Sequence, residues 1–327
     1  MPESFRRGAP LVVVLHGCTQ TAGGYDRNAG WSNAAEEHGF ALLFPEQQRT
    51  NNPNLCFNWF SPDDAGRGLG EALSIRQMVA AMQARHGTDA NRVFVTGLSA
   101  GGAMAGVMLA TYPDVFAGGA IIAGLPFGSA RSIPEAFDRM RAHGGGADSI
   151  LADRICSASA HNGPWPIVSI WHGTSDATVD VSNARASVDQ WRAIHHAAAA
   201  PSRMDSIDGH PHRVWSDPRG REVIEEYLIA GLGHGTPLSP TAGYGEIAGP
   251  FMLDAGISST REILRFWGIA RTIPATQTKR PSQQPVEATN PIRRSQPLPA
   301  AALARQNPST GVQKTIEDAL RAAGLMP

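Results

Sequence analysis

Short, mostly apolar segments alternate with longer helix-forming segments up to about residue 270, and this alternation restricts the fold more than any other feature of the chain. The predicted strands are Leu11–Leu15, Ala41–Phe44, Arg92–Thr96, Gly119–Ala123 and Ile167–Trp171. Apolar runs of this kind are typical of strands that a parallel sheet buries on both faces. The predicted helices between them are Trp31–His38, Gly70–His86, Ala100–Tyr112 and Val181–His195. Repeated strand–helix units predict an α/β domain of three layers around a mostly parallel sheet.

A hairpin and a change of composition complete the predicted organisation. Val214–Ser216 and Val223–Ile229 flank the turn Asp217–Gly220, a pattern that predicts a β-hairpin. Residues 271–308 are rich in Pro, Gln, Thr and Ser, with few large apolar side chains. We therefore predict one folded domain over residues 1–270 and a disordered tail over 271–327 that ends in a short helix at Thr315–Met326.

Charge and hydrophobic content exclude several classes of protein. With 28 Lys and Arg against 29 Asp and Glu, the net charge is −1, which argues against a nucleic-acid-binding protein. Hydrophobic residues make up 42% of the chain, enough for a sizeable core. No apolar run approaches the ~20 residues of a membrane-spanning helix, so we expect no membrane span. Basic residues precede the first apolar run without a small-residue cleavage site after it, so we predict no secretion signal in this chain.

The cysteines and histidines are not spaced as metal ligands. Cys18, Cys56 and Cys156 are too few for a disulfide scaffold and form no C-x-x-C pair, which leaves one disulfide and one free thiol as an option. The pairs His195–His196 and His210–His212 have no accompanying cysteine or His-Glu-x-x-His spacing. We interpret these histidines as surface residues and predict no metal.

The sequence Gly97-Leu-Ser-Ala-Gly101 follows a predicted strand and opens a predicted helix. This G-x-S-x-G pattern in a strand–turn–helix context is a nucleophile elbow, which presents Ser99 as a nucleophile. The turn needs glycines, because a Cβ at Gly97 or Gly101 would collide with the adjoining strand or helix. At a helix N-terminus, the free N–H groups and the helix dipole favour a developing negative charge.

A serine nucleophile needs a base and a carboxylate that orients the base, and both follow in the chain. Asp176 comes just after a predicted strand, with Asp180 as an alternative four residues later. His234 lies between glycines, Gly-His-Gly, in a loop after the predicted hairpin, where a core histidine is a poor explanation. The chain order Ser99, Asp176, His234 is that of α/β-hydrolases.

The oxyanion formed by such a nucleophile needs two N–H donors. We assign the first to Ala100, which follows the nucleophile, and the second to Cys18 in His16-Gly-Cys18, which follows the first predicted strand. Gly66–Gly70 lacks the Lys-Ser/Thr of a phosphate-binding loop. The aromatic residues Trp59 and Phe60 either wall a substrate cleft or fill the core, and the sequence alone does not decide between the two.

The chain resembles the polyhydroxybutyrate depolymerase-like esterases, α/β-hydrolases related to feruloyl and acetylxylan esterases. The matching stretches, spread over about residues 10–270, are His16–Gln20, Phe44–Gln47, Cys56–Phe60, Gly68–Ala72, Gly97–Gly102, Gly124–Gly128, His172–Asp176 and Gly231–His234. The resemblance implies an α/β-hydrolase fold, the same Ser99, Asp176 and His234, no cofactor, and an extracellular or periplasmic setting. It also suggests a Cys18–Cys56 disulfide and substrate-binding roles for Trp59 and Gln20.

From the residues and the resemblance together we expect a serine esterase that hydrolyses short-chain carboxylic esters, such as hydroxybutyrate oligomers, through an acyl-enzyme. Alternatives are a feruloyl or acetylxylan type of carbohydrate esterase, a serine peptidase, and an inactive protein that keeps the fold for binding. The expected partner is a small or oligomeric ester, and the oligomeric state stays open. We expect Ser129–Trp165 to cap the active site, with Gly144–Gly146 as a hinge; a plain surface excursion is the alternative.

Overall fold

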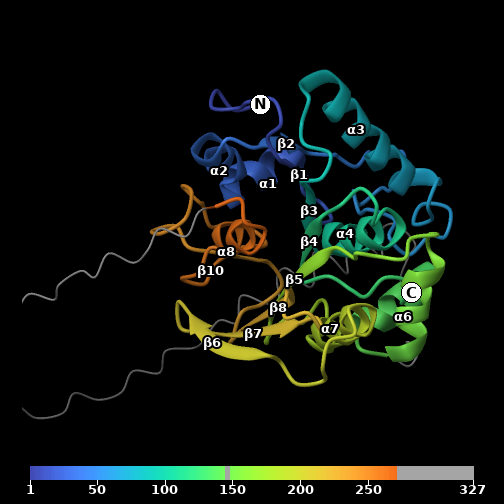
Figure 1. The fold of residues 1–327 in the computed structure, drawn as a ribbon. Helices are drawn as coiled ribbons and strands as arrows, with labels where there is room; N and C mark the ends of the chain where they lie inside the picture. The colour runs from blue at the N-terminus through green and yellow to red at the C-terminus, as the bar shows by residue number, and fades with distance from the viewer. Residues whose placement is uncertain (144–147, 271–327) are drawn as a thin grey trace, which may run out of the picture.

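A computed structural model describes residues 1–143 and 148–270 (Figure 1). The tail predicted over 271–327, with its helix at Thr315–Met326, lies outside the described residues. The hinge expected at Gly144–Gly146 lies outside them as well. None of the helices within the described ranges is long and apolar enough to cross a membrane.

The centre of the described domain is an eight-stranded sheet with the order β2-β1-β3-β4-β5-β8-β7-β6. Its strands are β1 (Leu11–Leu15), β2 (Ala41–Leu43), β3 (Val93–Leu98), β4 (Gly118–Ile122), β5 (Ile167–Gly173), β6 (Arg203–Ile207), β7 (His210–Ser216) and β8 (Glu222–Ile229). The strands from β2 to β8 in this order pair in parallel, and β7 and β6 are antiparallel. The five predicted strands and the predicted hairpin are confirmed, and β1, β3 and β4 are buried throughout, as continuous apolar runs require.

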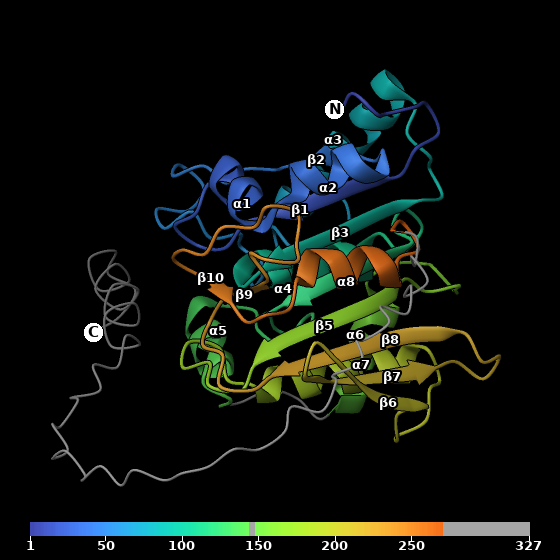
Figure 2. The same cartoon turned by 90° about the vertical axis from the view of Figure 1, so that its left-hand side faces the viewer.

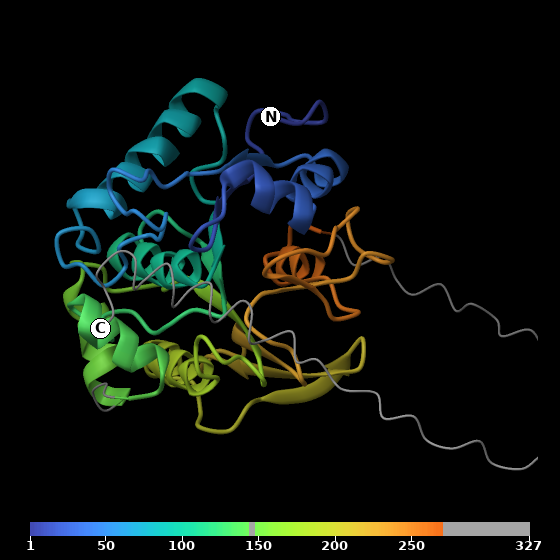
Figure 3. The same ribbon diagram turned by 180° about the vertical axis from the view of Figure 1, so that it is seen from behind.

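Helices cover both faces of the sheet (Figures 1 and 3). They are α1 (Ala22–Ala29), α2 (Trp31–His38), α3 (Gly70–His86), α4 (Ala100–Thr111), α5 (Ile133–Met140), α6 (Asp148–Ser157), α7 (Ser182–Ile194) and α8 (Ser259–Phe266). Alternate side chains of β1 enter different cores: Val13 packs in the core with α3, α4 and α7, and Val12 in the core with α1, α2 and α8. The predicted three-layer α/β architecture is therefore confirmed.

Several elements were not predicted, because their sequences carry weak signals. The edge strand β6 is mostly exposed and polar, so it shows no apolar alternation. The short pair β9 (Thr236–Leu238) and β10 (Met252–Asp254) has three residues in each strand. Helix α1 contains two glycines and depends on the Thr21 side chain, which accepts a hydrogen bond from the Gly24 N–H.

The prediction of surface histidines is wrong for His195 and His212. The ring of His195 is buried at the end of α7 and donates a hydrogen bond from Nε2 to the Pro166 carbonyl at 2.9 Å. The ring of His212 is buried between the carboxylates of Asp205 and Glu225. Within the described ranges, no three His, Cys, Asp or Glu side chains gather into a group that could hold a metal.

Acid should destabilise the fold through His195. Burial lowers the pKa of His195 to about 4, below its ordinary value of 6.5, so between these values the unfolded chain binds a proton that the folded chain does not. Stability is therefore lost as the pH falls through this window. Urea unfolding at pH 7 and at pH 4.5 measures how much unfolding free energy is lost between the two. This loss should be smaller in His195→Gln than in the wild type by about 2–3 kcal/mol. His196→Gln, at the exposed neighbour, is the control, and equal acid sensitivity of His195→Gln and wild type would contradict the prediction.

Candidate active site

The nucleophile elbow joins β3 to α4. Ser99 has φ 59° and ψ −120°, a strained conformation for a residue with a side chain. A Cβ on Gly97 would lie 2.4 Å from the Gly101 carbonyl oxygen, and a Cβ on Gly101 would lie 2.5 Å from the His16 carbonyl oxygen. Both contacts are impossible for real atoms, so the predicted steric need for the two glycines is confirmed.

The structure brings together the three residues that the sequence singled out as a triad. Asp176 follows β5, and His234 lies on the loop between β8 and β9. His234 Nδ1 is 2.7 Å from Asp176 Oδ2, and His234 Nε2 is 2.9 Å from Ser99 Oγ. Because a carboxylate only accepts hydrogen bonds, Nδ1 of His234 carries the proton and Nε2 accepts from the Ser99 hydroxyl.

Asp176 is held as a buried carboxylate. Its Oδ1 accepts hydrogen bonds from the backbone N–H groups of Thr178 and Val179, at 2.8 and 2.9 Å. Burial acts to raise the pKa of Asp176, but the charges and hydrogen bonds of His234 and His172 outweigh it and hold the pKa well below its usual range. Asp176 is therefore ionised when it faces His234.

The alternative carboxylate, Asp180, has a different environment. Its Oδ1 accepts a hydrogen bond from the Ser182 N–H at the start of α7, 2.9 Å away. His172, to which the sequence analysis assigned no role, lies with Nε2 3.3 Å from Asp176 Oδ2 and 2.8 Å from the Val179 carbonyl oxygen. Its position four residues before Asp176, within the same matching stretch, was the available signal.

Two backbone N–H groups lie beside Ser99. The Ala100 N–H is the first of α4 and has no partner in the helix's own hydrogen-bond ladder. Cys18 follows β1, which pairs in parallel with β3, so both strands end beside the same cavity, and Cys18, Ser99 and Ala100 all line it. In the described part of the chain, the Cys18 N–H donates no hydrogen bond, whereas the Ser99 N–H is engaged by the Ile122 carbonyl.

The loop that carries Cys18 is firmly held. The expected disulfide between Cys18 and Cys56 is present, and Cys156 is an exposed free thiol. The buried ring of His16 donates from Nδ1 to the Gly17 carbonyl at 2.8 Å and accepts at Nε2 from the Gln47 N–H at 3.1 Å. Burial also lowers the pKa of His16, so the ring is neutral and can fill both roles.

A buried carboxylate supports the segment around Asn58, close to the point where the disulfide joins it to that loop. Glu71, in the first turn of α3, accepts hydrogen bonds from both the backbone N–H and the side-chain amide of Asn58, each at 2.8 Å. It also accepts from the Gln47 side-chain amide at 2.5 Å. Burial raises the pKa of Glu71 to about 7. The sequence analysis missed this network, since no local pattern marks a carboxylate that works through loop residues far along the chain.

The two residues expected to bind substrate have different positions. Trp59 and Phe60 both line the cavity beside Ser99. Trp59 is also buried in the hydrophobic core, with Phe60 packed against that core, so the two alternatives left open by the sequence hold together. Gln20 is absent from the described residues that line this cavity. Its side-chain oxygen instead accepts a hydrogen bond from the Gly17 N–H at 2.8 Å, so it braces the loop of Cys18.

The cavity beside Ser99 is small and largely apolar, with a volume of about 100 Å³. Its walls come from the Cys18 loop, the segment 52–60, the elbow and helix α5. Figure 2 shows α5 at the end of the sheet toward which the arrow of β5 points. The α5 side chains on the cavity are Ile133, Ala136, Phe137 and Met140.

A mostly parallel sheet, a nucleophile elbow after one of its strands, and an acid and a histidine after later strands define an α/β-hydrolase. The fold is shared with the acetyl xylan esterase from Aspergillus awamori, with a TM-score of 0.66 and 23% identity over 82% of this chain and 92% of that one. Residues 2–203 match the esterase PHB depolymerase family, and the chain belongs to this family of ester hydrolases.

Two curated relatives are similar in sequence to most of this chain. Poly(3-hydroxyalkanoate) depolymerase C of Paucimonas lemoignei is 46% identical over 272 residues, which cover 82% of this chain and 66% of the relative. An acetylxylan esterase of Coprinopsis cinerea is 30% identical over 247 residues, 73% of this chain and 65% of the relative. The chain thus spans slightly less than two thirds of the length of these relatives.

Proposed function

We propose that the protein is a serine esterase that hydrolyses carboxylic esters through an acyl-enzyme. One observation carries the proposal: the hydrogen-bonded series Ser99, His234 and Asp176 lies beside the two N–H groups of Ala100 and Cys18. Nucleophile, base, orienting carboxylate and oxyanion donors are the parts that acyl transfer requires. Membership of a family of ester hydrolases supports the same reaction.

Each group has a defined task in this reaction. His234 Nε2 takes the proton of Ser99 as Oγ attacks the ester carbonyl carbon. The oxygen anion that forms accepts hydrogen bonds from the backbone N–H groups of Cys18 and Ala100. His234 then gives its proton to the alcohol oxygen as the C–O bond breaks. Water, deprotonated by His234, attacks the acyl-serine and releases the acid. Asp176 keeps the imidazole in the required tautomer and stabilises its charged form.

The substrate that we propose is a short-chain ester, with oligomers of 3-hydroxyalkanoates as the first choice. The similarity to a poly(3-hydroxyalkanoate) depolymerase supports this choice, and so does the small apolar cavity beside Ser99. An acetylxylan or feruloyl type of carbohydrate esterase is the second candidate, supported by the similarity to an acetylxylan esterase. The disulfide between Cys18 and Cys56 is consistent with work in an oxidising, extracellular setting.

A side-by-side assay tests the proposed function. The purified protein should hydrolyse p-nitrophenyl butyrate, and a fluorophosphonate probe should label it at Ser99 in the native state but not after unfolding. Acetylated xylan and 3-hydroxybutyrate oligomers, compared under the same conditions, separate the two substrate classes. A folded protein that neither turns over the ester nor reacts with the probe would instead be an inactive, binding form of the fold.

We also propose that residues 129–165 cap the active site, because α5 within this segment supplies one wall of the cavity. Phe137 is half-buried there, and its removal should admit longer acyl chains. In Phe137→Ala, the ratio of kcat/KM for p-nitrophenyl octanoate to that for the butyrate should rise about tenfold. Met204→Ala, at an exposed side chain of β6, is the control. An unchanged ratio in Phe137→Ala would contradict the cap.

A further inference from the structure

A second, larger cavity of about 550 Å³ lies on the other side of two aromatic side chains that also line the cavity beside Ser99. These shared residues are Trp59 and Phe60, whose rings meet edge to face with their centroids 5.7 Å apart. Neither Ser99 nor any other residue of the triad lines this second cavity. A substrate that extends from Ser99 past the two rings would therefore reach it.

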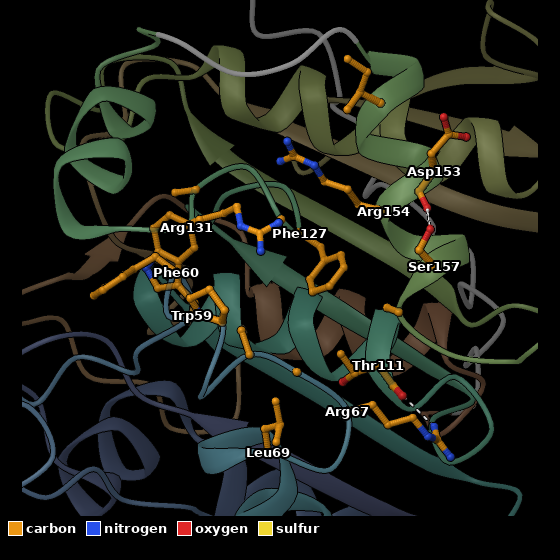
Figure 4. A pocket seen from close by; sticks show the side chains of 17 residues that line it. Trp59, Phe60, Arg67, Leu69, Thr111, Phe127, Arg131, Asp153, Arg154 and Ser157 are labelled. Atoms are coloured by element: carbon orange, nitrogen blue, oxygen red, sulfur yellow. Dashed lines mark hydrogen bonds between the residues drawn. The ribbon is translucent and has the colours of Figure 1, made fainter.

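The second cavity contains two arginines without an ion pair. Arg131 comes from the segment before α5 and Arg154 from α6, and in Figure 4 their side chains extend toward one another. In the described residues, neither guanidinium has an acidic or hydrogen-bonding partner. Arg67, which also lines the cavity, is different: it pairs with Asp114 and donates to the Thr111 carbonyl, both at 2.6 Å.

The position of Arg154 depends on a glycine. Gly128 has φ 70°, and a Cβ there would lie 2.9 Å from Cδ of Arg154, so the half-buried stem of this arginine crosses the open face of the glycine. Two like charges that face the same space are unfavourable without a counter-charge. An anion placed between them would gain charge-assisted hydrogen bonds, for which the guanidinium geometry is well suited.

The other walls are mostly apolar. Phe127 lies within the cavity in Figure 4, and two exposed large hydrophobic side chains, Leu69 and Ile150, also line it. The one acidic side chain among the described lining residues is that of Asp153, which forms no ion pair in the described part of the chain. The cavity therefore combines room for a hydrocarbon segment with an excess of positive charge.

We propose that this cavity binds a carboxylate at the far end of the ester substrate, held by Arg131 and Arg154. This inference rests on the proposed esterase function and specifies its substrates as esters whose leaving alcohol bears a carboxylate. A linear oligomer of a 3-hydroxy acid has this form: whichever ester bond is cut, the free carboxylate stays on the alcohol side. The acyl part then occupies the small cavity at Ser99, and the acidic end lies beyond Trp59 and Phe60.

The test compares two substrates that differ only at the terminal carboxyl group: the linear trimer of 3-hydroxybutyrate as the free acid and as its methyl ester, with cleavage of the internal ester bonds followed for both. In the wild type, kcat/KM should be at least tenfold higher for the acid. The double variant Arg131→Gln, Arg154→Gln should lose about 10- to 100-fold in kcat/KM for the acid, mainly through KM, and keep the value for the methyl ester. Asp153→Asn should raise kcat/KM for the acid.

Controls separate this inference from the proposed function. Arg219→Gln removes an exposed arginine on the turn before β8, at the opposite end of the parallel strands from Ser99, and should change kcat/KM for neither substrate. Hydrolysis of p-nitrophenyl butyrate by the double variant shows that it is folded. If the wild type cleaves that ester but treats the acid and methyl ester alike, the carboxylate site is wrong and the esterase stands. If it cleaves none of the three, the proposed function fails.

Discussion

Replacement of Ser99 by alanine should lower kcat for p-nitrophenyl butyrate by about 10⁶-fold, to the level that binding and the oxyanion donors alone provide. The loss is this large because His234 and Asp176 act only through the Ser99 hydroxyl, whose Oγ lies 2.9 Å from His234 Nε2. The wild type and the variant are compared at equal protein concentration, with p-nitrophenolate release followed over hours for the variant.

The alanine variant should keep the thermal unfolding midpoint of the wild type or exceed it, because the change removes one hydroxyl from a strained turn. Ser74→Ala, at an exposed serine of α3, is the matched control and should keep full activity. Retention of most of the activity in Ser99→Ala would show that another residue is the nucleophile.

Replacement of Asp176 by asparagine should lower kcat by about 10⁴-fold with little change in structure. An asparagine side chain can offer its N–H₂ group to His234 Nδ1, which would place the imidazole proton on Nε2, where it blocks acceptance from Ser99. The buried site also loses the negative charge that stabilises protonated His234 in the transition state. The measurement is kcat for p-nitrophenyl butyrate across pH 6 to 9.

Asp180→Asn provides a closely matched control, since it makes the same chemical change four residues away. It should retain nearly all activity, because Asp180 caps the backbone at the start of α7 rather than facing His234. A larger loss in Asp180→Asn than in Asp176→Asn would reverse the assignment of the carboxylate.

Much of the site could be predicted because its signals are local. The strand before Ser99 is apolar, the turn needs two glycines for steric reasons, and a helix follows at once. Asp176 and His234 both follow strands of one parallel sheet, and the carboxyl ends of such strands meet at one edge. Chain order and strand ends were therefore enough to bring the three residues together.

The directions of loop side chains depend on contacts between distant segments, which no local pattern records. Both Gln20 and Trp59 were expected to bind substrate, but Gln20 accepts a hydrogen bond from the Gly17 N–H, whereas Trp59 lines the cavity beside Ser99. His195 was interpreted as a surface residue because it lacks the sequence companions of a metal ligand, but the Pro166 carbonyl gives its N–H a buried partner. Arg131 and Arg154 are far apart in the sequence, and the two charges meet at one cavity only because α6 packs near the segment before α5.

The disulfide between Cys18 and Cys56 makes one wall of the cavity beside Ser99 depend on the redox state of these two cysteines. It joins the loop of Cys18, the proposed oxyanion donor, to the segment 52–60, and in the described part of the chain a backbone hydrogen bond from the Thr19 N–H to the Asn54 carbonyl, at 2.8 Å, also joins the two. In a reducing compartment the triad would keep its geometry, whereas the Cys18 N–H, which we propose as an oxyanion donor, would lose one of its restraints. Oxidation of the two thiols would then be the step that completes this wall of the cavity.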